Sequence, residues 1–67
     1  MNAPPIVSEN AFAAAEVFQR PDGLFQFRGF FSTKEGWEEI NTSGIYADAA
    51  AAEADARIWV DEESTTP

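Results

Sequence analysis

The sequence contains no cysteine and no histidine among its 67 residues. The chain therefore forms no disulfide and offers neither a thiolate nor an imidazole to a structural zinc ion. It also lacks the Ser–His and Cys–His pairs of covalent catalysis, and the imidazole group that most often transfers protons in active sites. Carboxylates are the remaining candidates for catalysis.

The carboxylates form no catalytic pair in the sequence pattern. Glu38 and Glu39 are adjacent, so on a strand their side chains point to opposite faces. Glu53 and Asp55 are two residues apart, a spacing at which helical side chains do not face each other. The acidic run at residues 61–63 lacks the spaced ligands and central glycine of a calcium-binding loop. We therefore expect a protein without enzymatic activity, cofactor or bound metal.

Long apolar runs are also missing. No stretch approaches the ~20 apolar residues of a membrane span. The first residues do not combine a basic region with an apolar run, as a secretion signal does. We expect a soluble protein of the cytoplasm that does not bind membranes.

Basic residues are few and unevenly distributed. Four Lys and Arg stand against twelve Asp and Glu, which gives a formal net charge of -8. The charges balance in residues 1–34, and the whole acidic excess lies in residues 35–67, where Arg57 is the only basic residue. Nucleic acids are bound largely through Lys and Arg that neutralise phosphates. We therefore expect no direct binding of DNA or RNA.

A chain this short forms at most one domain and buries only about 60% of the surface that its unfolded form exposes. Pro4 and Pro5 lie in an N-terminal segment with little to bury, and the other end of the sequence is acidic and polar. We place a single domain at residues 8–61, between flexible tails at residues 1–7 and 62–67.

Turn residues predict a β-hairpin. Pro21, Asp22 and Gly23 suit successive positions of a tight turn that ends in a glycine with positive φ. Strands are expected over residues 16–20 and 24–32, with Glu16 opposite Arg28 as a cross-strand ion pair. Gly36 suggests a second turn before a third strand at residues 37–41, although nothing fixes the register of that hairpin. The pattern indicates a three-stranded antiparallel meander.

The Ala-rich segment after Tyr46 predicts a helix. Asp48 suits the N-cap, and residues 49–60 contain no Gly or Pro. Glu53 and Arg57 are spaced for an ion pair on its outer side. Ser8 suggests a further short helix over residues 9–15. The expected fold is α+β, a ββ(β)α layer with the C-terminal helix packed on one face of the sheet. Its inner positions are expected to be Ala49, Ala52, Ala56, Trp59 and Val60.

The two faces of the expected sheet are both apolar. One helix covers only one face, which is expected to carry Ala15, Val17, Phe25, Phe27 and Phe31. Three explanations remain open for the aromatic residues of the second face: a lid formed by Ile6, Val7 and Phe12, a protein-binding surface, or harmless exposure. The residues concerned are Phe18, Leu24 and Phe30, with Arg20 and Arg28 between them.

Residues 18–28 and 43–46, followed by the Ala-rich helix, look like small sheet-then-helix domains of unknown function from bacteria and phages. In size, acidity and lack of catalytic residues the chain also resembles phage-encoded inhibitors, including anti-CRISPR proteins and other DNA mimics. The resemblance is one of type, and it assigns no functional residues. It implies an inhibitor that acts in the cytoplasm, which is the host cytoplasm for a phage protein.

The leading hypothesis is an acidic inhibitor that binds a basic, nucleic-acid-handling protein in place of phosphates. The alternative is a structural or adaptor domain that forms a homodimer or docks through Phe18, Leu24, Phe30, Arg20 and Arg28. Acidity that only keeps the domain soluble is a third explanation. In the leading hypothesis the carboxylates that contact the target are Glu35, Glu38, Glu39, Asp48, Glu53, Asp55, Asp61, Glu62 and Glu63.

Overall fold

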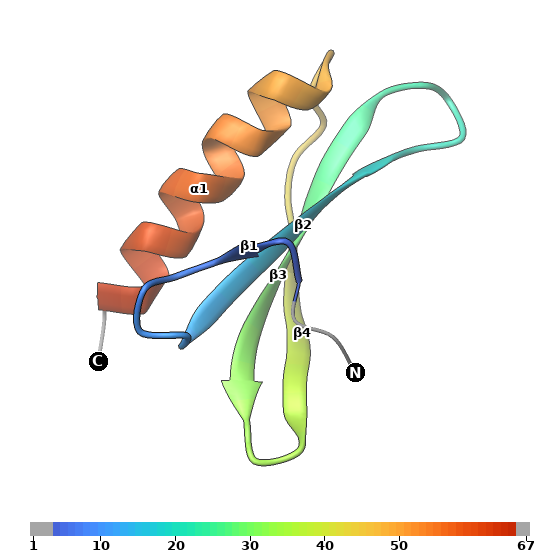
Figure 1. Cartoon of the computed structure of the whole chain (residues 1–67). Helices are drawn as coiled ribbons and strands as arrows, with labels where there is room; N and C mark the ends of the chain where they lie inside the picture. The colour runs from blue at the N-terminus through green and yellow to red at the C-terminus, as the bar shows by residue number, and fades with distance from the viewer. Residues whose placement is uncertain (1–3, 66–67) are drawn as a thin grey trace.

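The computed structural model describes residues 4–65 as a small α+β domain, an open antiparallel sheet with one C-terminal helix (Figure 1). The four strands lie in the sheet in the order in which they occur in the chain. The elements are β1 at Ile6–Val7, β2 at Ala13–Gln19, β3 at Phe25–Thr33, β4 at Gly36–Thr42 and α1 at Ala49–Thr65.

The hairpin of β2 and β3 closes as the turn residues predict. Gly23 has a φ of 88°, in the left-handed region that glycine favours. The Leu24 amide donates to the Asp22 carboxylate at 3.0 Å, and the Arg20 amide donates to the Leu24 carbonyl at 2.7 Å. The hydrogen bond from the Leu24 amide, together with the Arg20 side chain, lowers the pKa of the Asp22 carboxyl. The expected pairing of Glu16 with Arg28 is confirmed, with an ion pair at 2.8 Å.

The second hairpin contains a bulge that the sequence did not predict. Trp37 pairs with Ser32 and Glu39 pairs with Phe30, but Asn41 is the next residue of β4 to find a partner, Gly29. Ile40 is therefore the extra residue of β4. Such a bulge locally disrupts the ladder and bends the strand.

The sheet has four strands and not the expected three, because Ile6 and Val7 pair with Ala15 and Ala14. The helix predicted over residues 9–15 is wrong, since β2 begins at Ala13. A short isolated helix is marginal in water, and burial against neighbouring elements overrides the helix propensity of alanine. Ala13, Ala14 and Ala15 are completely buried in the strand.

Both predicted tails contain ordered residues. Ile6 and Val7, placed in the N-terminal tail, form β1, and α1 continues beyond residue 61 to Thr65. Within this last turn the Ser64 hydroxyl donates to the Asp61 carbonyl at 3.0 Å. The rest of the predicted tails, residues 1–3 and 66–67, lies outside the described residues.

The helix begins where Asp48 predicts. Its carboxylate accepts a hydrogen bond from the Ala51 amide at 2.8 Å, which satisfies one of the free N–H groups of the first turn. The expected pair of Glu53 and Arg57 is also present on the outer side, at 2.8 Å. The inner positions are buried as predicted at Ala52, Ala56 and Val60 and half-buried at Trp59, whereas Ala49 is exposed.

Trp59 packs α1 onto the sheet at a notch. Gly29 lies between Phe27 and Phe31 on the helix side of β3, and the Trp59 ring occupies the space above its missing side chain. The Trp59 ring centroid is 6.1 Å from that of Phe27 and 6.2 Å from that of Phe31. Ala15, which pairs with Gly29, is buried in the same cluster.

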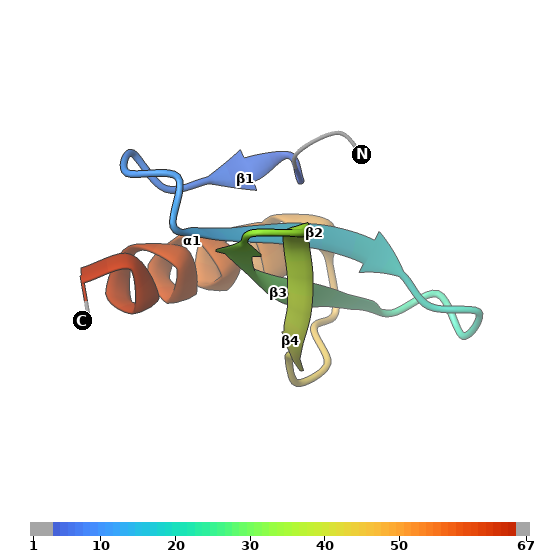
Figure 2. The same ribbon diagram turned by 90° about the horizontal axis from the view of Figure 1, so that it is seen from below.

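This packing covers only part of the sheet. Among residues 4–65, α1 contacts β1, β2 and β3 but makes no contact with β4. Figure 1 shows the hairpin of β3 and β4 extending away from α1, and Figure 2 shows how steeply β4 is twisted relative to β2. Within the described residues, no helix therefore covers β4 or the face of the sheet opposite α1.

The notch generates a stability prediction. A Cβ at Gly29 would lie 2.7 Å from Cζ2 and 2.8 Å from Cζ3 of Trp59, too close for the ring to stay in place. Gly29→Ala should therefore lower the free energy of unfolding by about 1–3 kcal/mol through overpacking. The control is Gly44→Ala, whose Cβ would meet no atom within 4 Å. Equal midpoints for both variants in denaturant unfolding would show that Trp59 does not occupy this notch.

Candidate protein-interaction surfaces

Charged and polar groups are confined to the surface of the described residues. No polar or charged side chain is buried, and no group of acidic side chains is placed to hold a metal ion, within residues 4–65. The same residues contain no helix that is long and apolar enough to cross a membrane. The polar and charged side chains with which residues 4–65 could contact a partner therefore lie on exposed faces and edges of the domain.

The sheet face opposite α1, called the open face below, carries three aromatic side chains. Phe18 of β2, Phe30 of β3 and Trp37 of β4 lie on it at half-buried positions. Val7 of β1 lies at its far edge, paired with Ala14, and is 40% exposed. Aromatic residues thus extend over three neighbouring strands without a helix above them.

Arg28 forms a polar centre within the open face. Its guanidinium carbon lies 4.0 Å from the centroid of the Phe18 ring, a cation–π contact. Its Nη1 is 2.8 Å from Glu16 Oε1, and its Nε is 4.0 Å from Glu39 Oε1. The three charged side chains form a row across β2, β3 and β4. This row carries one excess negative charge, so the open face is both aromatic and weakly acidic.

The structure brings together only part of the alternative interface. Phe18, Arg28 and Phe30 share the open face, where Arg28 contacts the Phe18 ring and Phe30 is the next residue of β3 on that face. Arg20 and Leu24 belong to the same face but lie at the turn of the hairpin, where Arg20 Nη2 is 3.1 Å from the Asp22 carboxylate.

The predicted lid over this face does not form from the residues named for it. Ile6 is buried in the core on the α1 side, and the Phe12 ring stacks on Phe31 at 5.0 Å, also on the α1 side. Of the three residues only Val7 reaches the open face, at its edge. Among the described residues, Phe18 and Phe30 are therefore not covered by the N-terminal segment.

Sequence reasoning did not place Trp37 or Glu39 on the open face, although Glu39 is one of the nine carboxylates of the leading hypothesis. Their spacing of two along a strand was visible and places them on one face. Which face they share depends on the register of β3 with β4, and Gly36 alone does not determine it. Pairing of Glu39 with Phe30 and of Trp37 with Ser32 places both on the open face.

The nine carboxylates of the leading hypothesis fall into two groups, one on β4 and the turn before it and the other on α1 and its N-cap. Glu35, Glu38 and Glu39 belong to the hairpin of β3 and β4, and α1 makes no contact with β4. Glu39 lies on the open face, and Glu38 points to the opposite side of the strand. The remaining six lie at the start of α1 or within it: Asp48, Glu53, Asp55, Asp61, Glu62 and Glu63.

Three of the four basic residues are neutralised within the chain. Arg20 is 3.1 Å from Asp22, Arg28 is 2.8 Å from Glu16, and Arg57 is 2.8 Å from Glu53. Of the carboxylates in these three pairs, Glu53 is the one that belongs to the nine of the leading hypothesis. By contrast, the exposed side chains of Glu35, Glu38 and Asp61 make no ion pair or hydrogen bond with the described residues. The surface presented to a partner is therefore strongly negative.

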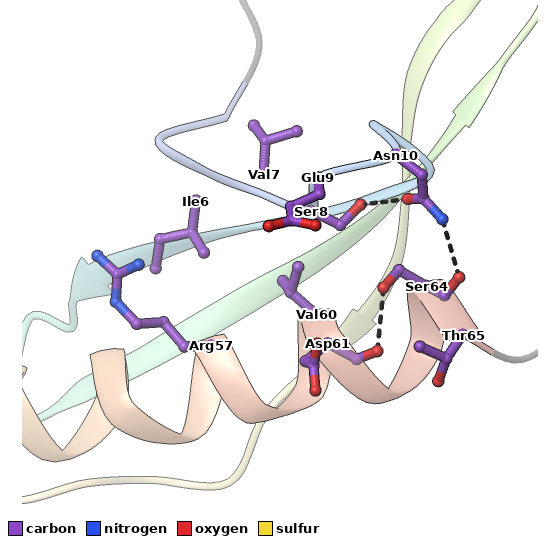
Figure 3. Close-up of a pocket in the computed structure, with 10 residues that line it drawn as sticks. All are labelled: Ile6, Val7, Ser8, Glu9, Asn10, Arg57, Val60, Asp61, Ser64 and Thr65. Carbon is purple, nitrogen blue, oxygen red and sulfur yellow. Dashed lines mark hydrogen bonds between the residues drawn. The ribbon is translucent and has the colours of Figure 1, made fainter.

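A shallow cavity of about 420 Å³ lies between the N-terminal segment and the last turns of α1 (Figure 3). Ile6 and Val60 supply apolar lining, and Arg57 and Asp61 supply charges of opposite sign. The Asn10 side-chain amide donates to the Ser64 carbonyl at 3.0 Å and so connects the two walls. The hydrogen bond ties the turn before β2 to the end of α1.

The chain was compared with known proteins on the basis of sequence and of structure. No protein-family model, curated protein or solved structure matches it. The surfaces described above are therefore the basis for inferring function.

The contact between Tyr46 and Asp55 generates a titration prediction. Partial burial and, secondarily, the hydrogen bond to the Asp55 carboxylate raise the pKa of Tyr46 above its ordinary value of 10.0. Tyr46 is the only tyrosine, so tyrosinate absorbance reports it alone. We expect a pKa above 10.0 in the folded protein and a smaller elevation in Asp55→Asn.

The sign of the linked stability follows from the raised pKa. The folded state holds the phenol proton of Tyr46 more tightly than the unfolded state does. The resulting contribution to the free energy of unfolding is therefore fully present below the pKa of the unfolded state. It is lost as pH rises through the folded pKa. An absorbance midpoint at or below 10.0 in the wild type would contradict the Tyr46 environment described here.

Proposed function

We propose that this chain is a small acidic binding protein that occupies a basic, nucleic-acid-binding surface of a target protein, as a DNA-mimic inhibitor does. The observation that supports the proposal is the internal neutralisation of Arg20, Arg28 and Arg57. Because these cations are paired, little positive charge opposes the approach of a basic surface to the free carboxylates.

The exposed carboxylates favour an association with a basic target that is accelerated by long-range electrostatic attraction and weakened by salt. A single exposed ion pair contributes only about 0–1 kcal/mol, so no one carboxylate dominates binding. Several together attract a basic target over a distance and raise the association rate, and salt screens this attraction. The exposed carboxylates of the β3–β4 hairpin and those of α1 form two separate groups of contacts for this purpose.

A second candidate function is an adaptor that docks, or forms a homodimer, through the open face. The uncovered positions of Phe18, Phe30 and Trp37 favour it. Aromatic residues beside an arginine are enriched among the residues that dominate binding energy at protein interfaces. Such an interface would persist at high salt, because apolar contacts are not screened.

The decisive experiment compares two triple variants with the wild type in capture of partners from the native host. Neutralisation of three unpaired carboxylates by Glu35→Gln, Glu38→Gln and Asp61→Asn keeps side-chain shape. At about half a kcal/mol each, it should weaken binding to the captured protein by about tenfold. Replacement of the same three residues by Lys should weaken binding to the captured protein further, because the attraction between each carboxylate and the basic target becomes a repulsion. Duplex DNA or RNA should compete with the wild type for the partner.

The matched control is the open-face double variant Phe18→Ser and Phe30→Ser, which leaves Trp37 and the carboxylates unchanged. Under the proposed function it retains salt-sensitive binding. Loss of binding in this variant, with unchanged binding by both triple variants, would contradict acidic mimicry and support the adaptor function. Circular dichroism of each variant should first show that the sheet and helix are retained.

A further inference from the structure

The free edge of β4 is a second feature of this molecule that can bind a partner. Among residues 4–65, six of the seven residues of β4 pair with β3 on one side, and the strand pairs with no strand on the other. An edge strand presents a row of backbone N–H and C=O groups that another extended chain can pair with. The other edge strand, β1, has only two residues and offers a much shorter template.

Neither α1 nor β1 shields this edge. No described residue of α1 contacts β4, and every residue of β4 except the half-buried Trp37 is exposed. The bulge at Ile40 bends the strand, so residues 36–39 form its regular part. This regular part contains Trp37, Glu38 and Glu39.

The side chains of this part determine what kind of strand fits. Glu39 points to the open face and Glu38 to the opposite side, so both flanks of the edge are acidic. Trp37 lies on the open face, two residues from Glu39. An added strand would place consecutive side chains alternately beside Glu38 on one side, and beside Trp37 and Glu39 on the other.

A second copy of this chain is a poor fit. The antiparallel register that pairs all seven residues joins Gly36 to Thr42 of the second copy, and it places Glu39 directly opposite Glu39. On the opposite face of the sheet, Glu38 of one copy becomes the diagonal neighbour of Glu38 of the other copy. Like charges directly opposite one another destabilise a strand pair. In this register the acidic residues therefore oppose self-association through β4, whereas they attract a basic strand.

We propose that β4 binds an extended, Lys- and Arg-containing segment of the partner protein as a fifth strand of the sheet. The proposal rests on the proposed function, in that the partner is basic. Backbone hydrogen bonds would supply affinity, and two consecutive basic side chains, one toward Glu38 and one toward Glu39, would supply specificity. The basic side chain on the open face would also lie near the Trp37 ring, within reach of a cation–π contact.

The test uses synthetic peptides whose charge and backbone are changed separately. The parent is the end-capped peptide Thr-Val-Lys-Lys-Val-Thr-Val-Thr. Two further peptides carry N-methyl groups on alternate amides. In one of them the methylated amides lie along one edge of the extended peptide, and in the other they lie along the opposite edge. A fourth peptide has Glu in place of both Lys. Calorimetry measures the affinity of each for the full chain, and hydrogen exchange measures protection of the β4 amides.

Edge pairing predicts an asymmetry between the two methylated isomers. The isomer methylated on the edge that faces β4 should bind at least tenfold more weakly than the parent, and the other should bind about as tightly. The parent should also slow exchange of β4 amides. Equal binding by both isomers, or unchanged exchange in β4, would overturn edge pairing and leave the proposed function intact.

Charge is tested independently of the backbone. The Glu peptide should bind at least tenfold more weakly than the parent, and Glu38→Gln with Glu39→Gln should weaken parent binding severalfold. The matched control removes two exposed carboxylates remote from β4, by Glu9→Gln and Asp61→Asn, and should change binding less. Equal affinity for the Lys and Glu peptides would contradict the proposed function itself, together with this inference.

Discussion

The packing of Trp59 over Gly29 is the contact on which the arrangement of this domain depends. The glycine lies between Phe27 and Phe31 on one face of β3, and the indole ring fills the notch between them. A large aromatic group buries much apolar surface, which a domain with so thin a core needs. Around this contact, alanines on β2 and α1 are completely buried and let the helix lie close to the sheet.

The same contact explains which surfaces remain available. With Trp59 fixed over β3, α1 covers β1, β2 and β3 and does not reach β4. The open face and the β4 edge are left uncovered among the described residues, and both carry acidic side chains beside Trp37. The apolar core and the acidic interaction surface therefore lie on different parts of one small sheet.

Features set by short-range chemistry could be predicted from the sequence. The turn at Asp22 and Gly23 determined the register of the first hairpin, and with it the pair of Glu16 and Arg28. Asp48 marked the start of the helix, and the spacing of its small residues identified most of its inner face. In each case neighbouring residues in the sequence supply the interaction that decides the structure.

Features set by contacts between distant segments could not be predicted. Residues 13–15 read as helical in sequence, but burial between β1, β3 and α1 makes them a strand. The register of β3 with β4 fixes the face on which Trp37 and Glu39 lie, and Gly36 alone does not determine it. A lid of the N-terminal segment over Phe18 and Phe30 was one of three explanations left open by the sequence, and the structure places Ile6 and Phe12 on the α1 side instead.

The two tryptophans allow the most direct test of the central claim, that the partner binds the acidic, uncovered part of the sheet and leaves the core unchanged. Trp37 lies on the open face and Trp59 lies against Gly29. The measurement is the NMR shift of the two indole N–H signals during titration with the parent Lys peptide. The account predicts a saturable shift of the Trp37 signal with little change at Trp59. A shift confined to Trp59 and the amides of α1 would contradict it.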